Sequence, residues 1–232
     1  YNEASDKLIF ADLENAEPVS AAEKLVQVSN ETVDSAIGSN SLYRAAEIYQ
    51  ENDFKYEGVQ LFASYTKRYP KVFDLNIEAR QFNVDYYDEI GQKADALKWR
   101  KSIIGFEKQH RAKSTDRSSY LAANASLNIA MLGLDGFNAL KLTLPLKKSL
   151  NAKTVALKKL IDKFQALSAY QVAEVQSAST YQIGLIYRNL AQDLINSERP
   201  QGLSELELEQ YNILLEEEAF PFEEQAFDIF KI

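Results

Sequence analysis

The stretch "SLYRAAEIYQENDFKYEGVQLFASYTKRYP", residues 41–70, decides the fold. It contains two amphipathic segments separated by a short polar break, which is typical of two helices joined by a turn. Ala46 and Gly58 are small enough to let the two helices approach closely, and aromatic side chains nearby fill the gap beside them. Pro70 ends the second segment, because proline cannot continue the hydrogen-bond ladder of a helix. The stretch therefore predicts a tightly packed helix–turn–helix unit.

The spacing matches the tetratricopeptide repeat (TPR), a helix–turn–helix unit of 34 residues. With Pro70 at the repeat's closing position, the other signature positions are occupied by Leu42, Ala45, Ala46, Tyr49, Gly58, Phe62 and Tyr65. The alternative is an ordinary bundle of amphipathic helices, since apolar residues recur every three or four positions in any such bundle. The combined spacing of small, aromatic and proline positions favours the repeat.

Three further units follow with less regular spacing. "YYDEIGQKADALKW", residues 86–99, places a turn at Gly91, and "SYLAANASLNIAML", residues 119–132, has the small residues of another first helix. "TYQIGLIY", residues 180–187, opens a fourth unit with Gly184 at the position of close approach. Its second helix is delayed to "PFEEQAFDIF", so about 30 residues are inserted within the fourth unit.

The first of two predicted insertions, residues 134–167, reads as a basic amphipathic helix. Leucines, an isoleucine and a phenylalanine share one stripe, and most lysines lie off that stripe, with Lys153 as the exception. Such a helix can bind an anionic membrane surface or an acidic partner. It can equally pack its apolar stripe on the repeats, and both interpretations stay open at this point.

The insertion in the fourth unit is acidic and begins with its own helix signal. Ser204 is followed three residues later by Glu207, a capping-box pattern that predicts a helix start. Ser20 and Glu23 form a similar signal near the N-terminus.

These patterns predict an all-α fold, a TPR-like α–α superhelix (solenoid) with two helical insertions. The predicted organisation is an N-terminal helical segment at 1–40, two repeats at 41–110, a third repeat with the basic insertion at 111–170, and a fourth with the acidic insertion at 171–232. The chain lacks an initiating Met and stops inside an apparent helix, which indicates a piece of a longer protein truncated at its C-terminus.

The net charge of −8 conceals an uneven distribution. Residues 1–97 carry −9, residues 98–163 carry +10, and residues 164–232 again carry −9. Such a pattern suggests complementary faces or partners, and the acidic flanks argue against nucleic acid as a partner. No apolar run approaches the roughly 18 residues of a membrane span, so we expect no transmembrane segment in this stretch.

The sequence offers no constellation for catalysis. It has no Cys and a single His, His110, which lies near the expected end of a helix, where the helix dipole favours it. Phosphate-binding loops, nucleophile elbows and zinc-protease motifs are absent from the sequence. We therefore predict a protein that is not an enzyme, with no catalytic residues, cofactor or metal.

In a TPR array the first helices line a groove that binds a partner. The first two units present mostly acidic groove positions, with Tyr43 expected at the mouth, and this surface suits a basic peptide or helix. Solvated carboxylates without a partner are the alternative. The predicted groove residues are Tyr43, Glu47, Gln50, Glu51, Gln81, Asp85, Asp88, Tyr181, Arg188 and Asn189. We expect the fragment itself to be monomeric.

Three longer motifs carry a family resemblance: "LKLTLPLKKSL" (140–150), "YQVAEVQSASTYQIGLIYRNLAQDLINSERPQGLSELELEQY" (170–211) and "LLEEEAFPFEEQAFDIF" (214–230). Together with the repeat at 41–70, they resemble the C-terminal region of large periplasmic TPR proteins of proteobacteria. That family is associated with gliding-motility machinery and Tol/Exb-type motor complexes. The resemblance spans roughly residues 41–232.

The resemblance implies a non-enzymatic scaffold in the periplasm, or bacterial cell envelope, that links inner-membrane motor components to outer-membrane ones. One alternative is an outer-membrane assembly or cell-division TPR protein, although regular repeats without insertions would then be expected. Another is a module that binds peptidoglycan or a wall polymer, which requires exposed groove aromatics such as Tyr43 and Tyr181.

Overall fold

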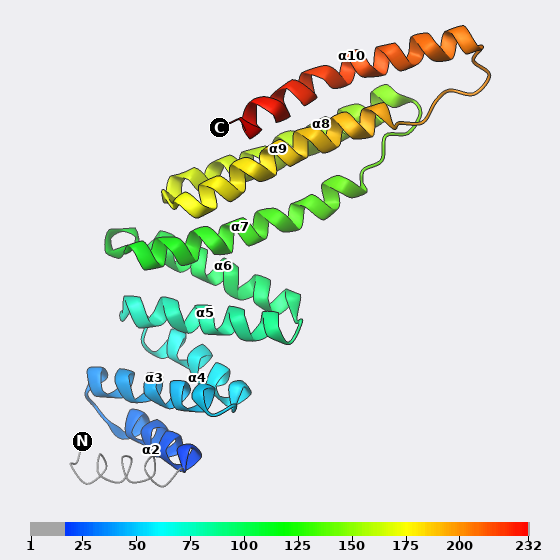
Figure 1. Cartoon of the computed structure of the whole chain (residues 1–232). Helices are drawn as coiled ribbons and strands as arrows, with labels where there is room; N and C mark the ends of the chain where they lie inside the picture. Colours follow the sequence, from blue (N-terminus) through cyan, green and yellow to red (C-terminus); the bar gives the residue numbers. More distant parts are fainter. Residues whose placement is uncertain (1–16, 232) are drawn as a thin grey trace. The chain divides into compact units, whose positions relative to one another are not determined.

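The computed structural model describes residues 17–231, which contain nine α-helices, two 3-10 helices and no strand (Figure 1). The all-α prediction is therefore confirmed. The chain forms two compact units that divide between Ala122 and Ala123, inside helix α7. Residues 1–16 of the predicted N-terminal segment lie outside the described residues.

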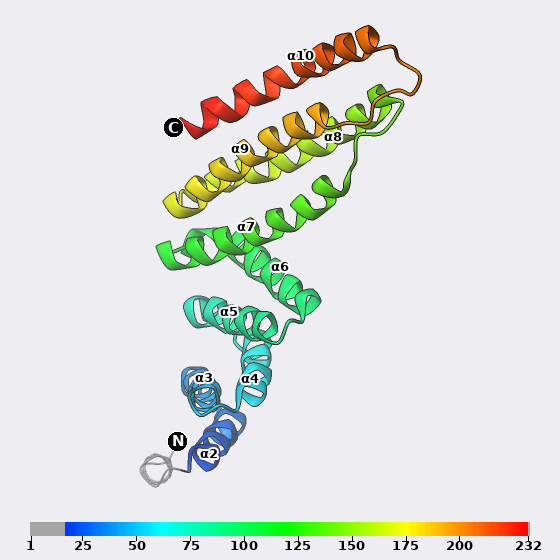
Figure 2. The same ribbon diagram turned by 45° about the vertical axis from the view of Figure 1, so that its right-hand side comes forward.

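The first unit consists of consecutive helices, and the first five of them each pack on their neighbour in the chain (Figure 2). Its elements are α2 (Pro18–Glu31), α3 (Ser35–Glu51), α4 (Lys55–Arg68), α5 (Phe73–Glu89), α6 (Lys93–Gln109), the 3-10 helix η1 (Arg111–Lys113) and the start of α7 (Asp116–Ala139).

Local signals set the ends of these helices. The carboxylate of Asp34 caps α3 by accepting hydrogen bonds from the amides of Ala36 (2.8 Å) and Ile37 (3.2 Å). Gly91 turns the chain between α5 and α6 with a φ of 72°, a conformation that favours glycine. The predicted helix start at Ser20 was wrong, because α2 already begins at Pro18, and proline is well suited to the first position of a helix.

The pair α3 and α4 has the close approach that the repeat requires. A Cβ atom on Gly58 would lie 3.0 Å from the backbone oxygen of Ala46 on α3. Phe62 is fully buried beside this contact and stacks on Phe82 of α5, with 4.4 Å between ring centroids. Small and aromatic positions of the repeat thus have the predicted roles.

The second unit contains the remainder of α7, followed by α8 (Leu146–Gln165), the 3-10 helix η2 (Ala166–Tyr170), α9 (Ala173–Ile195) and α10 (Glu205–Phe230). Figures 1 and 2 both show α8 beside α9, and α10 along the other side of α9. No helix within residues 17–231 is long and apolar enough to cross a membrane.

The apolar stripe of the basic helix α8 faces the core of the second unit. Its buried members, including Leu157, Leu160 and Phe164, pack with side chains of α7 and α9. Lys153 is also fully buried and forms an ion pair with Asp193 on α9. The packing of the stripe supports the second interpretation of this helix, in which it stabilises the repeats.

The extra residues of the fourth unit lengthen α9 and α10 and form the loop between them. The capping box at Ser204 and Glu207 starts α10 as predicted. At the opposite end of α10, the ring of Phe230 lies over Gly184 on α9, so that a Cβ atom on Gly184 would be 2.6 Å from the ring. Gly184 and Phe230 are therefore in contact, as a small residue of the first helix and an aromatic residue of the second helix are in a TPR pair.

We expect Gly184→Leu to destabilise the second unit by about 1–2 kcal/mol, at the lower end of the range for overpacked sites. The added side chain must displace the ring of Phe230, which is partly exposed and lies near the end of α10, so that it can yield. Hydrogen exchange should show faster opening of the C-terminal turns of α10. Unchanged exchange there would contradict the contact.

Candidate functional site

The predicted groove residues belong to both units, and each set is described by itself. On α3 and α5 of the first unit lie Tyr43, Glu47, Gln50, Glu51, Gln81, Asp85 and Asp88, and on α9 of the second unit lie Tyr181, Arg188 and Asn189.

Tyr43 does not lie at the mouth of a groove, so this part of the prediction was wrong. Its side chain is buried and makes edge contacts with the rings of Phe62 and Tyr65, each at 5.2 Å between centroids. Burial raises the pKa of its hydroxyl, and the nearby carboxylates of Glu47 and Glu78 raise this pKa further. Tyr43 is therefore a core residue at the junction of α3, α4 and α5.

The carboxylates of α3 are paired within their own helix. Arg44 contacts Glu47 at 3.2 Å and Glu51 at 3.0 Å, and all three side chains are partly exposed. Gln50 donates a hydrogen bond to the backbone oxygen of Lys55 at 3.2 Å, so its amide helps to hold the α3–α4 turn.

The carboxylates of α5 pair with cations from three other helices. Glu78 binds Arg117 of α7 at 2.7 Å, Glu89 binds Lys55 of α4 at 2.6 Å, and Asp88 forms an ion pair with Arg100 of α6. These pairs fix α5 against its neighbours. They also neutralise a surface that the sequence alone presents as acidic.

Asp85 differs because its hydrogen bond comes from the neutral amide of Gln81, at 2.7 Å. The side chain reaches solvent, yet partial burial raises the pKa of its carboxyl group, and the charge of Asp88 raises it further. Asp85 therefore loses its charge at a higher pH than an ordinary aspartate. A cationic group placed beside it would counter both effects.

Sequence reasoning missed the cations that face these carboxylates. Arg44 lies three residues before Glu47 on one helix, a spacing that signals an ion pair. Arg100 and Arg117 gave no comparable signal, because they reach α5 from separate helices. The α3–α5 face, as we name the surface formed by these paired residues, has six carboxylates and four cations, and thus a net charge of −2.

On α9 the predicted residues are more accessible. Tyr181 is 55% exposed, with its ring centroid 5.7 Å from that of Phe230. Arg188 is exposed and Asn189 is half-buried. Tyr181 borders a shallow depression of about 320 Å³ between α9 and the end of α10.

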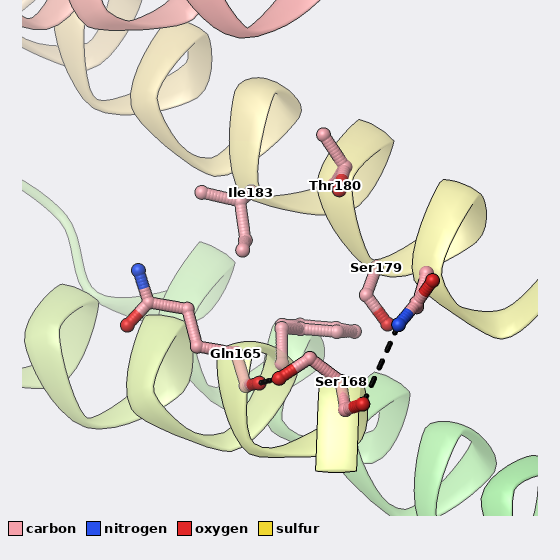
Figure 3. Close-up of a pocket in the computed structure, with 7 residues that line it drawn as sticks. Gln165, Ser168, Ser179, Thr180 and Ile183 are labelled. Atoms are coloured by element: carbon pink, nitrogen blue, oxygen red, sulfur yellow. Dashed lines mark hydrogen bonds between the residues drawn. The ribbon is translucent and has the colours of Figure 1, made fainter. Parts of the chain in front are cut away.

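A second depression, of about 210 Å³, lies between the end of α8 and α9 (Figure 3). The hydroxyl of Ser168 donates to the backbone oxygen of Gln165 at 2.8 Å. The residues that line it are Phe164, Gln165, Ser168, Gln176, Ser179, Thr180 and Ile183. None of these seven ionises near neutral pH, so this depression has no acid, base or activated nucleophile of its own.

The remaining titratable candidates have structural roles. Nδ1 of His110 hydrogen-bonds the backbone oxygen of Phe106 at 2.9 Å, at the C-terminal end of α6. Buried Glu107 accepts hydrogen bonds from Ser114 at 2.7 Å and Arg111 at 3.2 Å, which ties the end of α6 to the following turn. Among residues 17–231, no three His, Asp or Glu side chains gather as a metal site would require.

No family model matches the chain, and no curated protein matches it. The solved structures that are similar over most of its length include the following two. One is a putative kinesin light chain with nearly identical TPR-like repeats from Podosopora anserina, with 16% identity, 97% of this chain and 93% of that chain covered, and a TM-score of 0.38. The other is BtubC (BKLC) from P. vanneervenii, with 14% identity, coverages of 98% and 89%, and a TM-score of 0.36.

The helix pairs themselves define the class of this protein. Ala46 against Gly58, and Gly184 against Phe230, reproduce the close approach of small and aromatic positions within a TPR pair. The chain is thus an all-α protein built from TPR-like helical pairs.

Proposed function

We propose that this protein is a non-enzymatic scaffold for protein–protein interaction, and that its α3–α5 face binds a basic peptide or helix. One observation carries this proposal. Neighbouring first helices place partly exposed carboxylates, among them Glu47, Asp85 and Asp88, on a surface whose cations do not fully balance them.

The internal ion pairs leave room for such a partner. Exposed ion pairs contribute only about 0–1 kcal/mol each, because water and salt screen them. Lys or Arg side chains of a partner can therefore replace Arg44 in its ion pair with Glu51, or lie beside Asp85, at a small cost in free energy. We expect binding of modest affinity that weakens with increasing salt.

The test uses a fluorescent Lys-rich peptide and the triple variant Glu47→Ala, Asp85→Ala, Asp88→Ala. If each carboxylate contributes about 0.5 kcal/mol, affinity should fall about tenfold. Anisotropy titrations at low salt measure the change. Lowering the pH should also weaken binding to the unmodified chain, since Asp85 becomes neutral at a higher pH than an ordinary aspartate.

The matched control removes the same charge elsewhere in the first unit, with Glu23→Ala, Glu57→Ala and Asp74→Ala. These three side chains are exposed and lie outside the α3–α5 face. An equal loss of affinity in this control would mean that net charge alone drives binding, which would contradict the proposed face.

We also propose that the scaffold works in the periplasm, where it links inner-membrane motor components to outer-membrane ones, and that the fragment is monomeric. The support is the resemblance of residues 140–150, 170–211 and 214–230 to envelope TPR proteins. Fractionation and crosslinking of intact cells with the full-length protein should place it in the periplasm with such partners. Recovery in the cytosol would contradict this location.

The wall-polymer alternative has less support. Stacking on a glycan requires exposed aromatic rings, and of the two candidates Tyr43 is buried while Tyr181 is exposed. Of the two groove rings that this alternative requires, only Tyr181 is available to a polymer.

A further inference from the structure

Helix α10 has an apolar stripe on the face that does not contact α9. Its inner face is buried through Leu215, Ala219 and Ala226. The stripe consists of four side chains spaced seven residues apart, Leu206, Ile213, Phe220 and Phe227, whose exposed fractions are 64%, 50%, 60% and 58%.

Carboxylates border the stripe on both sides. In a helix, the residues three and four positions further on lie one turn away, on either side of the first. After each of the first three stripe residues, these positions hold Glu followed by Glu or Gln: Glu209, Gln210, Glu216, Glu217, Glu223 and Glu224, all exposed. We call these positions the acidic rows.

Single exposed apolar residues are ordinary on protein surfaces. Four large ones aligned every seven residues along one helix form a continuous narrow line, with one apolar residue per heptad where a coiled-coil seam has two, and a second helix that lies along this face can cover such a line. In residues 17–231, this face remains uncovered although the opposite face is packed, so the core of the second unit does not account for the stripe.

The charge of α10 determines which partner can cover its apolar stripe. Helix α10 contains nine Asp and Glu residues and no Lys or Arg between Glu205 and Phe230. A second copy of α10 would bring its own acidic rows against these, and an anionic membrane would be repelled in the same way. The basic helix α8 of a second copy is no substitute, because its apolar stripe is already buried.

We propose that the outer face of α10 binds an amphipathic helix of a separate protein, with apolar residues at heptad spacing flanked by Lys or Arg. The apolar residues of that helix would cover Ile213 and Phe220, and its cations would meet the acidic rows, as charged positions do in coiled coils. This surface is distinct from the α3–α5 face, and its evidence does not depend on the groove.

The test uses the full chain and a synthetic four-heptad peptide with Leu at the seam positions and Lys at the flanking positions. A second peptide has Glu in place of every Lys. In anisotropy titrations the Lys peptide should bind with one-to-one stoichiometry, and the Glu peptide should bind at least about tenfold more weakly. These titrations are made with the triple variant of the α3–α5 face, so that binding of the Lys peptide to that face does not contribute.

Matched variants on α10 locate the contact. The pair Ile213→Ser and Phe220→Ser should weaken binding about tenfold or more, whereas Leu214→Ser, which is equally exposed but turned about 100° away, should not. Glu216→Lys with Glu217→Lys should also weaken binding. Glu218→Lys, off the acidic rows, should have a smaller effect.

Several results would overturn the proposal. These are absence of binding by the Lys peptide, equal binding of both peptides, and loss of binding in Leu214→Ser to the same degree as in the stripe variant. Self-association of the unliganded chain that Ile213→Ser and Phe220→Ser abolish would identify a second copy as the occupant instead. Stripe-dependent binding to anionic vesicles would likewise replace the protein partner with a membrane.

Discussion

Replacing Gly58 with Leu is expected to destabilise the first unit by about 3 kcal/mol, at the upper end of the usual cost of overpacking. The Cβ atom alone would lie 3.0 Å from the backbone oxygen of Ala46, and a backbone atom cannot move aside as the end of a side chain can. The rest of the leucine would force α4 away from α3 and would open the contacts around buried Phe62.

Urea unfolding followed by the fluorescence of Trp99, the only tryptophan, reports on this unit because Trp99 lies in α6. Gly105→Leu is the matched control, since a Cβ atom there has no neighbour within 4 Å and leucine is a better helix former than glycine by about 0.5–1 kcal/mol. We expect the control to stabilise the unit. An unchanged or higher urea midpoint for Gly58→Leu would show that the two helices are not in close contact.

Removing the carboxylate of Asp193 is expected to destabilise the second unit by about 3 kcal/mol, the lower end of the range for breaking a buried ion pair. The Lys153 side chain is 1% exposed, so Asp193→Ala leaves its ammonium group with the backbone oxygen of Leu140 and the ring of Phe137 as remaining partners. We expect the lower end of this range because the Asp193 side chain is itself 38% exposed, so water can partly take the place of its carboxylate.

A second substitution tests whether the unpaired charge of Lys153 causes this loss of stability. Lys153→Met in the Asp193→Ala background removes the unpaired charge and should recover most of the lost stability, since an apolar side chain of similar length fits a buried site. Hydrogen exchange of α8 and α9 provides the measurement. Asp162→Ala, at an exposed position on α8, should have little effect. If Asp193→Ala alone leaves exchange unaltered, the ion pair does not support this core.

Much of the fold could be predicted because its signals are local. Ala46 and Gly58 allow the two helices of one pair to pack closely. Helix α4 ends before Pro70, and the chain turns at Gly91, and each of these features is set by the local backbone conformation. The start of α10 at Ser204 is equally local, since the capping box closes within three residues. Such features do not depend on what the rest of the chain does.

The candidate site was less predictable because its charges are balanced over long separations in the sequence. Arg117 reaches Glu78 across 39 residues, and Arg100 reaches Asp88 from the next helix. Tyr43 occupies a position that faces the groove in the repeat pattern, yet it is packed against Phe62 and Tyr65. Periodicity indicates which residues share a face, but not which neighbour covers that face.

The sequence by itself determined the helical class, the first repeat and the start of α10 at Ser204, because each follows from the regular geometry of a single helix or helical pair. Only the tertiary structure decided that Lys153 is buried against Asp193, that the carboxylates of α5 are paired, and that the stripe from Leu206 to Phe227 faces away from α9. These facts depend on how one helix packs against another, and side chains distant in sequence meet only through that packing.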